Sequence, residues 1–186
     1  MRGRDYYLSH ATAMELHAML TQPQLVVTVS TPVPRRAVTM LGVPFRFVRC
    51  QRRHLFGLIE HWVTKQDQVR VSDPERTIID GLKQPEHCGG VTEVAKGLWM
   101  RRQDLRVTTL LDYAAQLGVG AVLRRLGFLL ETYEMAPAPE LDTLRSTLTA
   151  THVRLDPVLP AAGKRLRRWR LQLNVNPEEL RAVVQT

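Results

Sequence analysis

The sequence predicts an α+β protein, with a small sheet in the N-terminal half, flanking helices and a helical C-terminal half. Three observations support this prediction. Segments with β-branched or alternating apolar residues gather before residue 72, and helical apolar spacing prevails from residue 101. The connections between the early strands are too short for helical crossovers. We therefore expect the small sheet to be mainly antiparallel.

The expected strands are short and differ in pattern. Residues 25–29 are rich in β-branched side chains, which favour a strand. Residues 43–49 alternate apolar and basic side chains, so that Phe45 and Phe47 share one face, as in a half-buried strand. Further strands are expected over 56–63 and 69–71. Together these segments give a sheet of roughly three to five strands.

Helices are expected where apolar residues recur at every third or fourth position. Ser9 is a candidate cap for the first helix, which Pro23 ends. Segment 168–174 alternates instead, with Trp169 and the following leucines on one face, and predicts a closing strand. Further helices are expected over 91–100, 107–117, 119–133 and 141–148, with a short strand over 152–155 and a last helical turn from Pro177.

One segment near the middle of the chain gives the sharpest local signal. Asp73 precedes Pro74, an ideal first helical residue, and Glu75 adds a negative charge where the helix dipole favours it. Asp80 follows Arg76 by one turn and is expected to accept a hydrogen bond from it. We interpret the segment as a structural motif that holds a helix to the sheet. The motif comprises Ser72, Asp73, Pro74, Glu75, Arg76, Thr77 and Asp80.

Composition fits a single globular domain over residues 1–186. Hydrophobic residues make up 44% of the chain and charged residues 24%. A soft boundary between two sub-lobes is expected near residues 100–106, where the pattern becomes helical. No apolar run reaches the roughly 18 residues that a bilayer span needs, and the N-terminus lacks the apolar stretch of a secretory signal. We therefore expect a cytoplasmic protein with no membrane contact and with Cys50 and Cys88 reduced.

The basic charge balance favours an acidic partner. The formal net charge is +8 and the isoelectric point is about 10.2. Residues 1–100 carry 13 basic and 9 acidic side chains, and residues 101–186 carry the same numbers. Because neither half is a basic tail, any basic surface must be assembled by folding. The partner classes that fit are nucleic acid and a protein with an acidic face.

Two basic clusters are the candidate binding residues. The first lies on and after a predicted strand and comprises Arg46, Arg49, Arg52 and Arg53. The second is denser and comprises Lys164, Arg165, Arg167, Arg168 and Arg170. Arginine suits bidentate contacts to carboxylate or phosphate, and the alternative is a solvated charged face. Our hypothesis is that both clusters contact the partner, and that charge reversal at Arg167, Arg168 and Arg170 abolishes binding while the fold stays intact.

Signatures of catalysis are absent from the sequence. There is no phosphate-binding Walker loop, no Gly-x-Ser-x-Gly nucleophile elbow and no His-Glu-x-x-His zinc motif. The histidines and cysteines do not pair at metal-ligand spacings. Glu93 and Lys96 are one residue too far apart for the acidic motif of many metal-dependent nucleases. We therefore expect a protein that is not an enzyme and needs neither metal nor cofactor.

Several segments, taken in order, resemble the C-terminal domain of AbiEi-family antitoxins. The most specific is Val71–Asp80, which is similar to the family's most diagnostic run. Tyr6–His10 resembles the opening of that domain, and Arg168–Asn174 resembles its closing strand. The other matching pieces are Val26–Thr31, Phe45–Val48, Phe56-Gly57, Gly89–Val91 and Glu93–Ala95. The resemblance covers about residues 5–180.

The resemblance implies an antitoxin of a type IV toxin–antitoxin system, which acts in abortive infection against phage. It implies a cognate nucleotidyltransferase-like toxin as the partner, neutralised directly or indirectly. Family members usually carry an N-terminal winged helix that binds operator DNA and represses their own operon. This sequence opens at the start of the domain that follows, so we expect that domain without the winged helix. The alternative function is a DNA-binding transcriptional regulator that acts through its basic surface. A nuclease and an inactive remnant are further alternatives.

Overall fold

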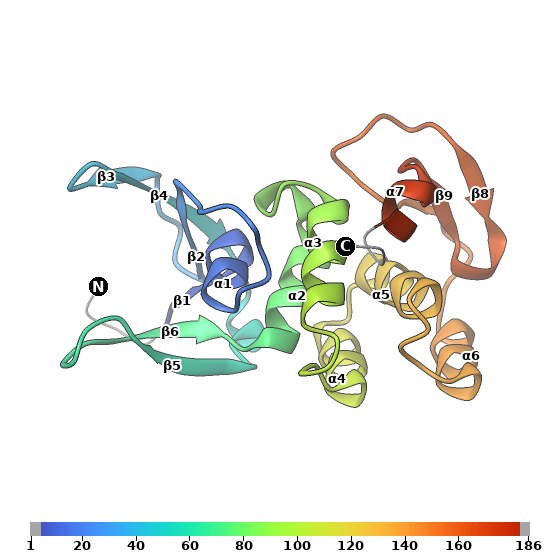
Figure 1. Cartoon of the computed structure of the whole chain (residues 1–186), viewed down its shortest axis with the longest axis horizontal. Helices are drawn as coiled ribbons and strands as arrows, with labels where there is room; N and C mark the ends of the chain where they lie inside the picture. The colour runs from blue at the N-terminus through green and yellow to red at the C-terminus, as the bar shows by residue number, and fades with distance from the viewer. Residues whose placement is uncertain (1–4, 183–186) are drawn as a thin grey trace.

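The computed structural model describes residues 5–182 and confirms the α+β class (Figure 1). A sheet occupies the N-terminal part, helices follow, and a small second sheet lies at the far end of the molecule. The strands of the first sheet are β1 (Tyr7–Leu8), β2 (Val27–Thr31), β3 (Val38–Met40), β4 (Val43–Arg49), β5 (Leu58–Trp62) and β6 (Gln68–Ser72). Their order is β3-β4-β2-β1-β6-β5.

The first sheet is mixed, although antiparallel pairs predominate. Strands β1–β2, β3–β4 and β5–β6 pair antiparallel, whereas β2–β4 and β1–β6 pair parallel. Short connections did not exclude parallel pairing, because the chain leaves β2, runs along the sheet edge as β3 and returns beside β2 as β4. Strand β3 therefore forms part of the connection between the parallel strands β2 and β4, where other parallel pairs have a crossover helix.

The helices follow the predicted order, with bounds that differ by a few residues. They are α1 (His10–Leu16), α2 (Pro74–Lys83), α3 (Val91–Met100), α4 (Val107–Leu117), α5 (Gly120–Thr132), α6 (Ala138–Ser146) and α7 (Pro177–Ala182). Short 3-10 helices are η1 (Arg52–His54), η2 (Pro85–His87) and η3 (Arg167–Trp169). The limits predicted for α3 and α4 agree with the structure, because Gly90 and Gly118 bound these helices with backbone that glycine adopts readily.

The start of α2 has the geometry that the sequence predicts. Asp73 Oδ1 accepts a hydrogen bond from the Arg76 amide at 2.7 Å, and Pro74 is the first helical residue. Ser72 and Thr77 share a hydrogen bond of 2.8 Å between their hydroxyls. The first amides of a helix have no partner within the helix, and the Asp73 carboxylate satisfies one of them.

Helix α2 lies between the sheet and the remaining helices (Figure 1). It contacts α1 on the sheet side and α3, α4 and α5 on the other. Ile78, Ile79 and Leu82 are fully buried along it and belong to one core with the C-terminal helices. The position of α2 therefore fixes how the two halves of the chain meet.

The second sheet corrects the predicted closing strand. It consists of β7 (Val153–Arg154), β9 (Leu171–Leu173) and β8 (Lys164–Leu166), in that order. The strand predicted over 168–174 begins only at Leu171, because η3 precedes it and Arg170 has a left-handed φ of +51°. Trp169 is nevertheless buried, and its ring packs so closely on Gly127 that a Cβ there would lie 2.2 Å away.

A buried arginine joins α2 to the sheet. Arg76 donates from Nε and Nη2 to Asp80 Oδ1 at 3.0 and 2.9 Å. Its Nη2 also donates to the Tyr7 hydroxyl at 3.1 Å, and that hydroxyl donates to Asp80 Oδ2 at 3.0 Å. Nη1 donates to the Phe56 carbonyl at 3.3 Å, and the guanidinium lies 4.2 Å from the centre of the Phe56 ring. The charge is thereby fully partnered in a site from which water is excluded.

We expect Arg76→Met to lower the free energy of unfolding by about 3–5 kcal/mol, because it leaves the buried Asp80 carboxylate without its counter-charge. Urea unfolding followed by circular dichroism measures this loss. The matched control is Lys96→Met, which removes a pair with Glu93 whose side chains are 46% and 36% exposed. That variant is expected to lose less than about 1 kcal/mol. Equal small losses in the two variants would contradict the role assigned to Arg76.

Candidate functional site

One face of the first sheet carries a continuous apolar row. Strand register pairs Phe47 with Val29 and Val29 with Leu8. It then pairs Leu8 with Val71 and Val71 with Ile59. Paired residues share a face of a sheet, so these five side chains cross five strands in one line. Val29 and Val71 are buried within the row, whereas Ile59 at its end is 42% exposed.

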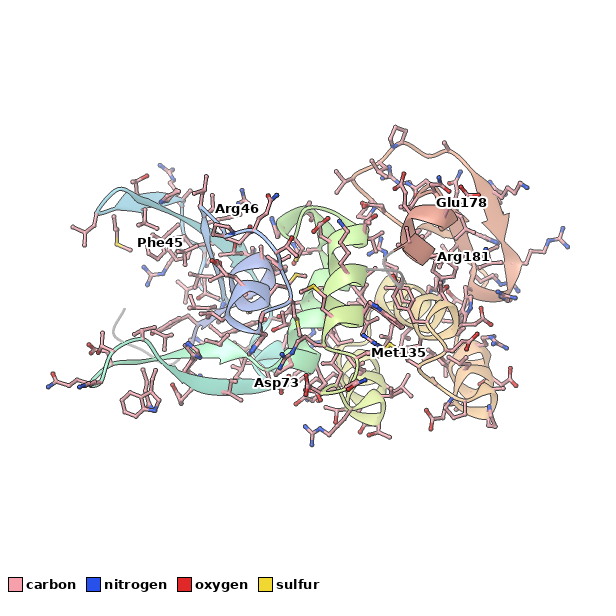
Figure 2. All side chains as sticks on the ribbon, viewed as in Figure 1. Phe45, Arg46, Asp73, Met135, Glu178 and Arg181 are labelled. Atoms are coloured by element: carbon pink, nitrogen blue, oxygen red, sulfur yellow. The ribbon has the colours of Figure 1, made fainter. Side chains whose placement is uncertain are left out.

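This apolar face opens into a cavity of about 570 Å³. Phe45 and Phe47 of β4 line it, together with Val38 and Met40 of the edge strand β3, which are 43% and 50% exposed. Figure 2 shows Phe45 and Arg46 on the β3–β4 side of the sheet. The loop before β3 adds two basic residues to the lining, Arg35 and Arg36. Within residues 5–182, no helical residue lines this cavity. We call this surface the open sheet face.

Helix α1 covers the opposite face of the sheet through small polar side chains. The hydroxyls of Ser9 and Ser30 lie 2.8 Å apart, and Thr12 Oγ1 accepts from the Thr28 amide at 2.8 Å. Ser9 occupies the cap position of α1, as predicted, but its side chain bonds to the sheet instead of capping the helix. The more apolar side of β2 and β4 is therefore the side that α1 leaves open.

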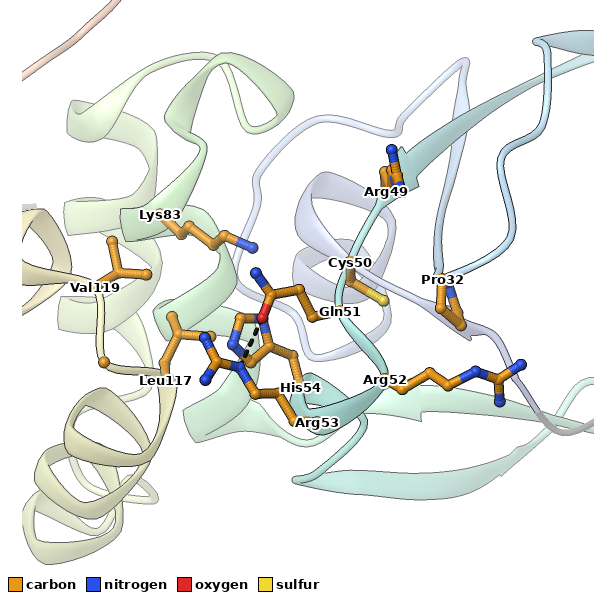
Figure 3. A pocket seen from close by; sticks show the side chains of 11 residues that line it. Pro32, Arg49, Cys50, Gln51, Arg52, Arg53, His54, Lys83, Leu117 and Val119 are labelled. Atoms are coloured by element: carbon orange, nitrogen blue, oxygen red, sulfur yellow. Dashed lines mark hydrogen bonds between the residues drawn. The ribbon is translucent and has the colours of Figure 1, made fainter.

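The first predicted basic cluster is divided by the strand that carries it. Arg46 and Arg49 are three residues apart in β4 and so point to opposite faces. Arg49, Arg52 and Arg53 line a second cavity of about 560 Å³, which we call the basic pocket (Figure 3). Arg46 lines a different cavity. Arg52 pairs with Asp5 at 2.7 Å and points away from the other pocket side chains.

The second predicted cluster lies around β8 and η3, at the opposite end of the molecule from β4 (Figure 1). Its exposed residues are Lys164, Arg165, Arg167 and Arg168. Arg168 pairs with Glu131 at 2.8 Å, and the same Glu131 oxygen accepts from the buried Trp169 indole at 2.8 Å. Charge reversal at Arg168 would place two carboxylates together beside a buried ring. These contacts lead us to expect that reversal at Arg168 disturbs the packing as well as the surface, in contrast to the prediction from the sequence.

The acidic residues of the predicted motif are engaged in structural contacts. Asp73 Oδ2 accepts from the Tyr113 hydroxyl at 2.8 Å, and Glu75 Oε1 accepts from the Arg106 amide at 3.0 Å. Burial raises the pKa of Asp73. Burial, followed by the hydrogen bond to Asp73, raises the pKa of Tyr113 to about 12. These contacts hold α2 against the start and middle of α4.

Three further observations bear on the class of protein. In the described part of the chain, no helix is both long enough and apolar enough to cross a membrane. Over the same residues, no three His, Cys, Asp or Glu side chains gather where they would hold a metal ion. Cys50 and Cys88 are buried and free. The candidate binding surfaces described above are the open sheet face, the basic pocket and the exposed cations around β8.

Helix α1 begins with a histidine that folding keeps neutral. His10 is 1% exposed, and its ring meets that of His87 edge to face at 5.2 Å between centroids. Nδ1 lies 2.8 Å from Ser9 Oγ, whereas Nε2 has no hydrogen-bond partner among the described residues. Burial is the main cause that lowers the pKa of His10 from its ordinary 6.5 to about 4.

Comparison with known proteins gives a shared fold. No protein-family model matches the sequence, and no curated protein matches it. Among solved structures, the chain is similar to the crystal structure of the RV2827C protein from Mycobacterium tuberculosis, with a TM-score of 0.66 and 15% sequence identity. The likeness covers 97% of this chain and 66% of that one, so this chain spans just under two thirds of the neighbour's length.

The neutral His10 predicts a loss of stability in acid. The pKa of His10 is lower in the folded than in the unfolded chain. Its contribution to the free energy of unfolding is therefore complete above pH 6.5 and falls as the pH drops from 6.5 towards 4. The slope from this group approaches about 1.4 kcal/mol per pH unit. His10→Asn should remove that slope, because the asparagine side chain does not titrate. The variant should also fold, since asparagine tolerates the left-handed φ of +53° at this position.

Urea unfolding of both proteins at pH 7, 6, 5 and 4.5 tests this expectation. A smaller slope persists in the variant, because burial also lowers the pKa of His17, His54 and His87. Identical pH profiles for the two proteins would show that folding does not lower the pKa of His10.

Proposed function

We propose that this chain is a non-catalytic binding module that acts in the cytoplasm as an antitoxin of the AbiEi type. Its partner is a nucleotidyltransferase-like toxin, which it neutralises by direct contact. The observation that supports this proposal most strongly is the open sheet face, where aromatic and aliphatic side chains surround a cavity beside two arginines. An antitoxin of this kind requires a complementary surface and no reactive group.

The open sheet face has the composition of a protein-binding surface. Contiguous exposed apolar side chains are costly in water and mark sites that a partner covers. Phenylalanine and methionine are enriched in the buried centres of interfaces, and arginine is enriched near them. Met40 and Val38 are the most accessible of the apolar side chains that line the cavity. They would be the first to contact a docking partner.

Charge indicates which kind of partner fits this face. Arg35 and Arg36 line the cavity, and the whole chain carries a net charge of +8. A toxin surface with apolar residues inside an acidic rim is the complement of this pattern. Such charge matching raises the association rate and disfavours basic competitors.

The decisive test is growth rescue. We expect that expression of a cognate nucleotidyltransferase-like toxin arrests a host, and that the wild-type chain restores growth. The double variant Val38→Asp/Met40→Asp should fail to rescue and should weaken toxin binding by roughly 30-fold or more, as loss of about 2 kcal/mol at an interface centre implies.

Val158→Asp is the matched control. Val158 is a similarly exposed apolar residue, 57% accessible, and lies away from the first sheet, between β7 and β8. The control should rescue like the wild type. Full rescue by the double variant, with unchanged affinity in a pull-down from purified components, would rule out the open sheet face as the docking site. Circular dichroism of both variants checks that they fold.

A second candidate function is DNA binding, favoured by the exposed cations around β8. Lys164, Arg165 and Arg167 extend from one short strand and its neighbouring turn. A helix-turn-helix reading of α4–α5 is disfavoured, because α5 is buried from Arg124 to Leu130 and cannot enter a major groove. Binding would therefore be to backbone phosphates.

This second candidate predicts steep salt dependence. The logarithm of the association constant for duplex DNA should fall linearly with the logarithm of the salt concentration. The slope should be about −0.9 for each phosphate contacted. Arg165→Glu/Arg167→Glu should reduce that slope, whereas Val38→Asp/Met40→Asp should not. A salt-independent association with operator DNA would exclude contact through these phosphate-binding side chains.

A further inference from the structure

The basic pocket gathers four cations, of which only Arg52 pairs with an acid among the described residues. Its lining includes Arg49, Arg53 and Lys83 and contains no aspartate or glutamate. Among residues 5–182, the side chains of Arg49 and Lys83 have no hydrogen-bond or ion-pair partner. Arg53 uses only Nε, which donates to Gln51 Oε1 at 2.6 Å. The remaining donors of these three side chains are free for a ligand.

A buried histidine in the pocket lacks any partner. His54 is 4% exposed and lines the cavity, yet neither Nδ1 nor Nε2 has a hydrogen-bond partner in the described part of the chain. Buried polar atoms are almost always satisfied, so two unsatisfied ring nitrogens at a cavity wall point to a group that binds there. Burial, then the nearby charge of Lys83, lowers the pKa of His54, which an arriving anion would oppose.

The start of α5 adds a third feature that favours an anion, the positive end of the helix dipole. Val119 occupies the position before the helix, lines the pocket and provides no side-chain cap. The uncapped amides and positive end of a 13-residue helix therefore lie at the pocket wall. Figure 3 shows the Lys83 ammonium group and the Gln51 side chain directed into the same space, above His54 and opposite the residues before α5.

We propose that the basic pocket binds a small molecule that carries linked phosphoryl groups. Free guanidinium and ammonium donors, an uncapped helix start and a buried imidazole form a recurrent setting for phosphate. The volume of about 560 Å³ lies within the range of small-ligand sites and exceeds what a single phosphate fills. Leu117 and Val119 offer an apolar wall for an uncharged part of the ligand.

This ligand site is independent of the proposed antitoxin function. The open sheet face and the basic pocket have no lining residue in common. Substitutions at Val38 and Met40 are therefore expected to leave the ligand affinity unchanged. Failure of toxin neutralisation and failure of phosphate binding can thus be told apart in the same set of variants.

Calorimetric titration of the full chain with sodium pyrophosphate, and separately with adenosine triphosphate, tests the proposal. Saturable binding of one ligand per chain is expected. Lys83→Glu and Arg53→Glu should each weaken it by about tenfold or more, the loss of one charge-assisted contact. Arg165→Glu/Arg167→Glu, which reverses charge at the other end of the molecule, should change the affinity by less than about twofold if the effect is local.

Nuclear magnetic resonance on the wild-type chain provides a readout at the site. Both ring nitrogens of His54 should shift on addition of pyrophosphate, and the His10 ring should not. The proposal is overturned if neither ligand binds saturably, if the distant double variant loses as much affinity as Lys83→Glu, or if the His54 ring signals stay unchanged. Displacement of pyrophosphate by a short DNA duplex, with equal dependence on Lys83, would instead assign the pocket to nucleic acid and overturn it as well.

Discussion

The contact between Arg76, Asp80 and Tyr7 is the constraint on which the arrangement of the molecule depends. Burial of a guanidinium is unfavourable unless its donors are satisfied, and here β1, α2 and the carbonyl before β5 satisfy them together. Because these partners come from distant parts of the sequence, the ion pair is complete only when sheet and helix are correctly docked. Such a network favours one docking geometry over others, whether or not it also adds to the free energy of unfolding.

The docking of α2 explains why the functional surfaces lie where they do. With α1 and α2 against one side of the sheet, the apolar row from Phe47 to Ile59 faces the other side. The end of α2 brings Lys83 beside η1 and the α4–α5 turn, where the basic pocket forms. Two binding surfaces of different chemistry therefore depend on the placement of a single helix.

The basic residues that give the chain its net charge lie on several separate surfaces. Part of the chain's basic excess lies in three places: around the open sheet face, in the basic pocket and around β8. Only some of these residues are free, since Arg168 and Arg52 pair with acids. The balance of free and paired arginines, more than their number, decides which surface can bind an anion.

The sequence by itself determined the α+β class, the limits of α3 and α4, the capped start of α2 and the contact between Arg76 and Asp80, because each depends on residues close together in the chain. It did not reveal β1 or β3, which are too short to show a pattern, or the parallel pairing of β2 with β4. The tertiary structure alone decided that Arg46 and Arg49 separate, that Arg168 serves packing, and that Lys83 and His54 join the pocket. Those outcomes depend on which distant segments meet, and local residue patterns carry no information about such meetings.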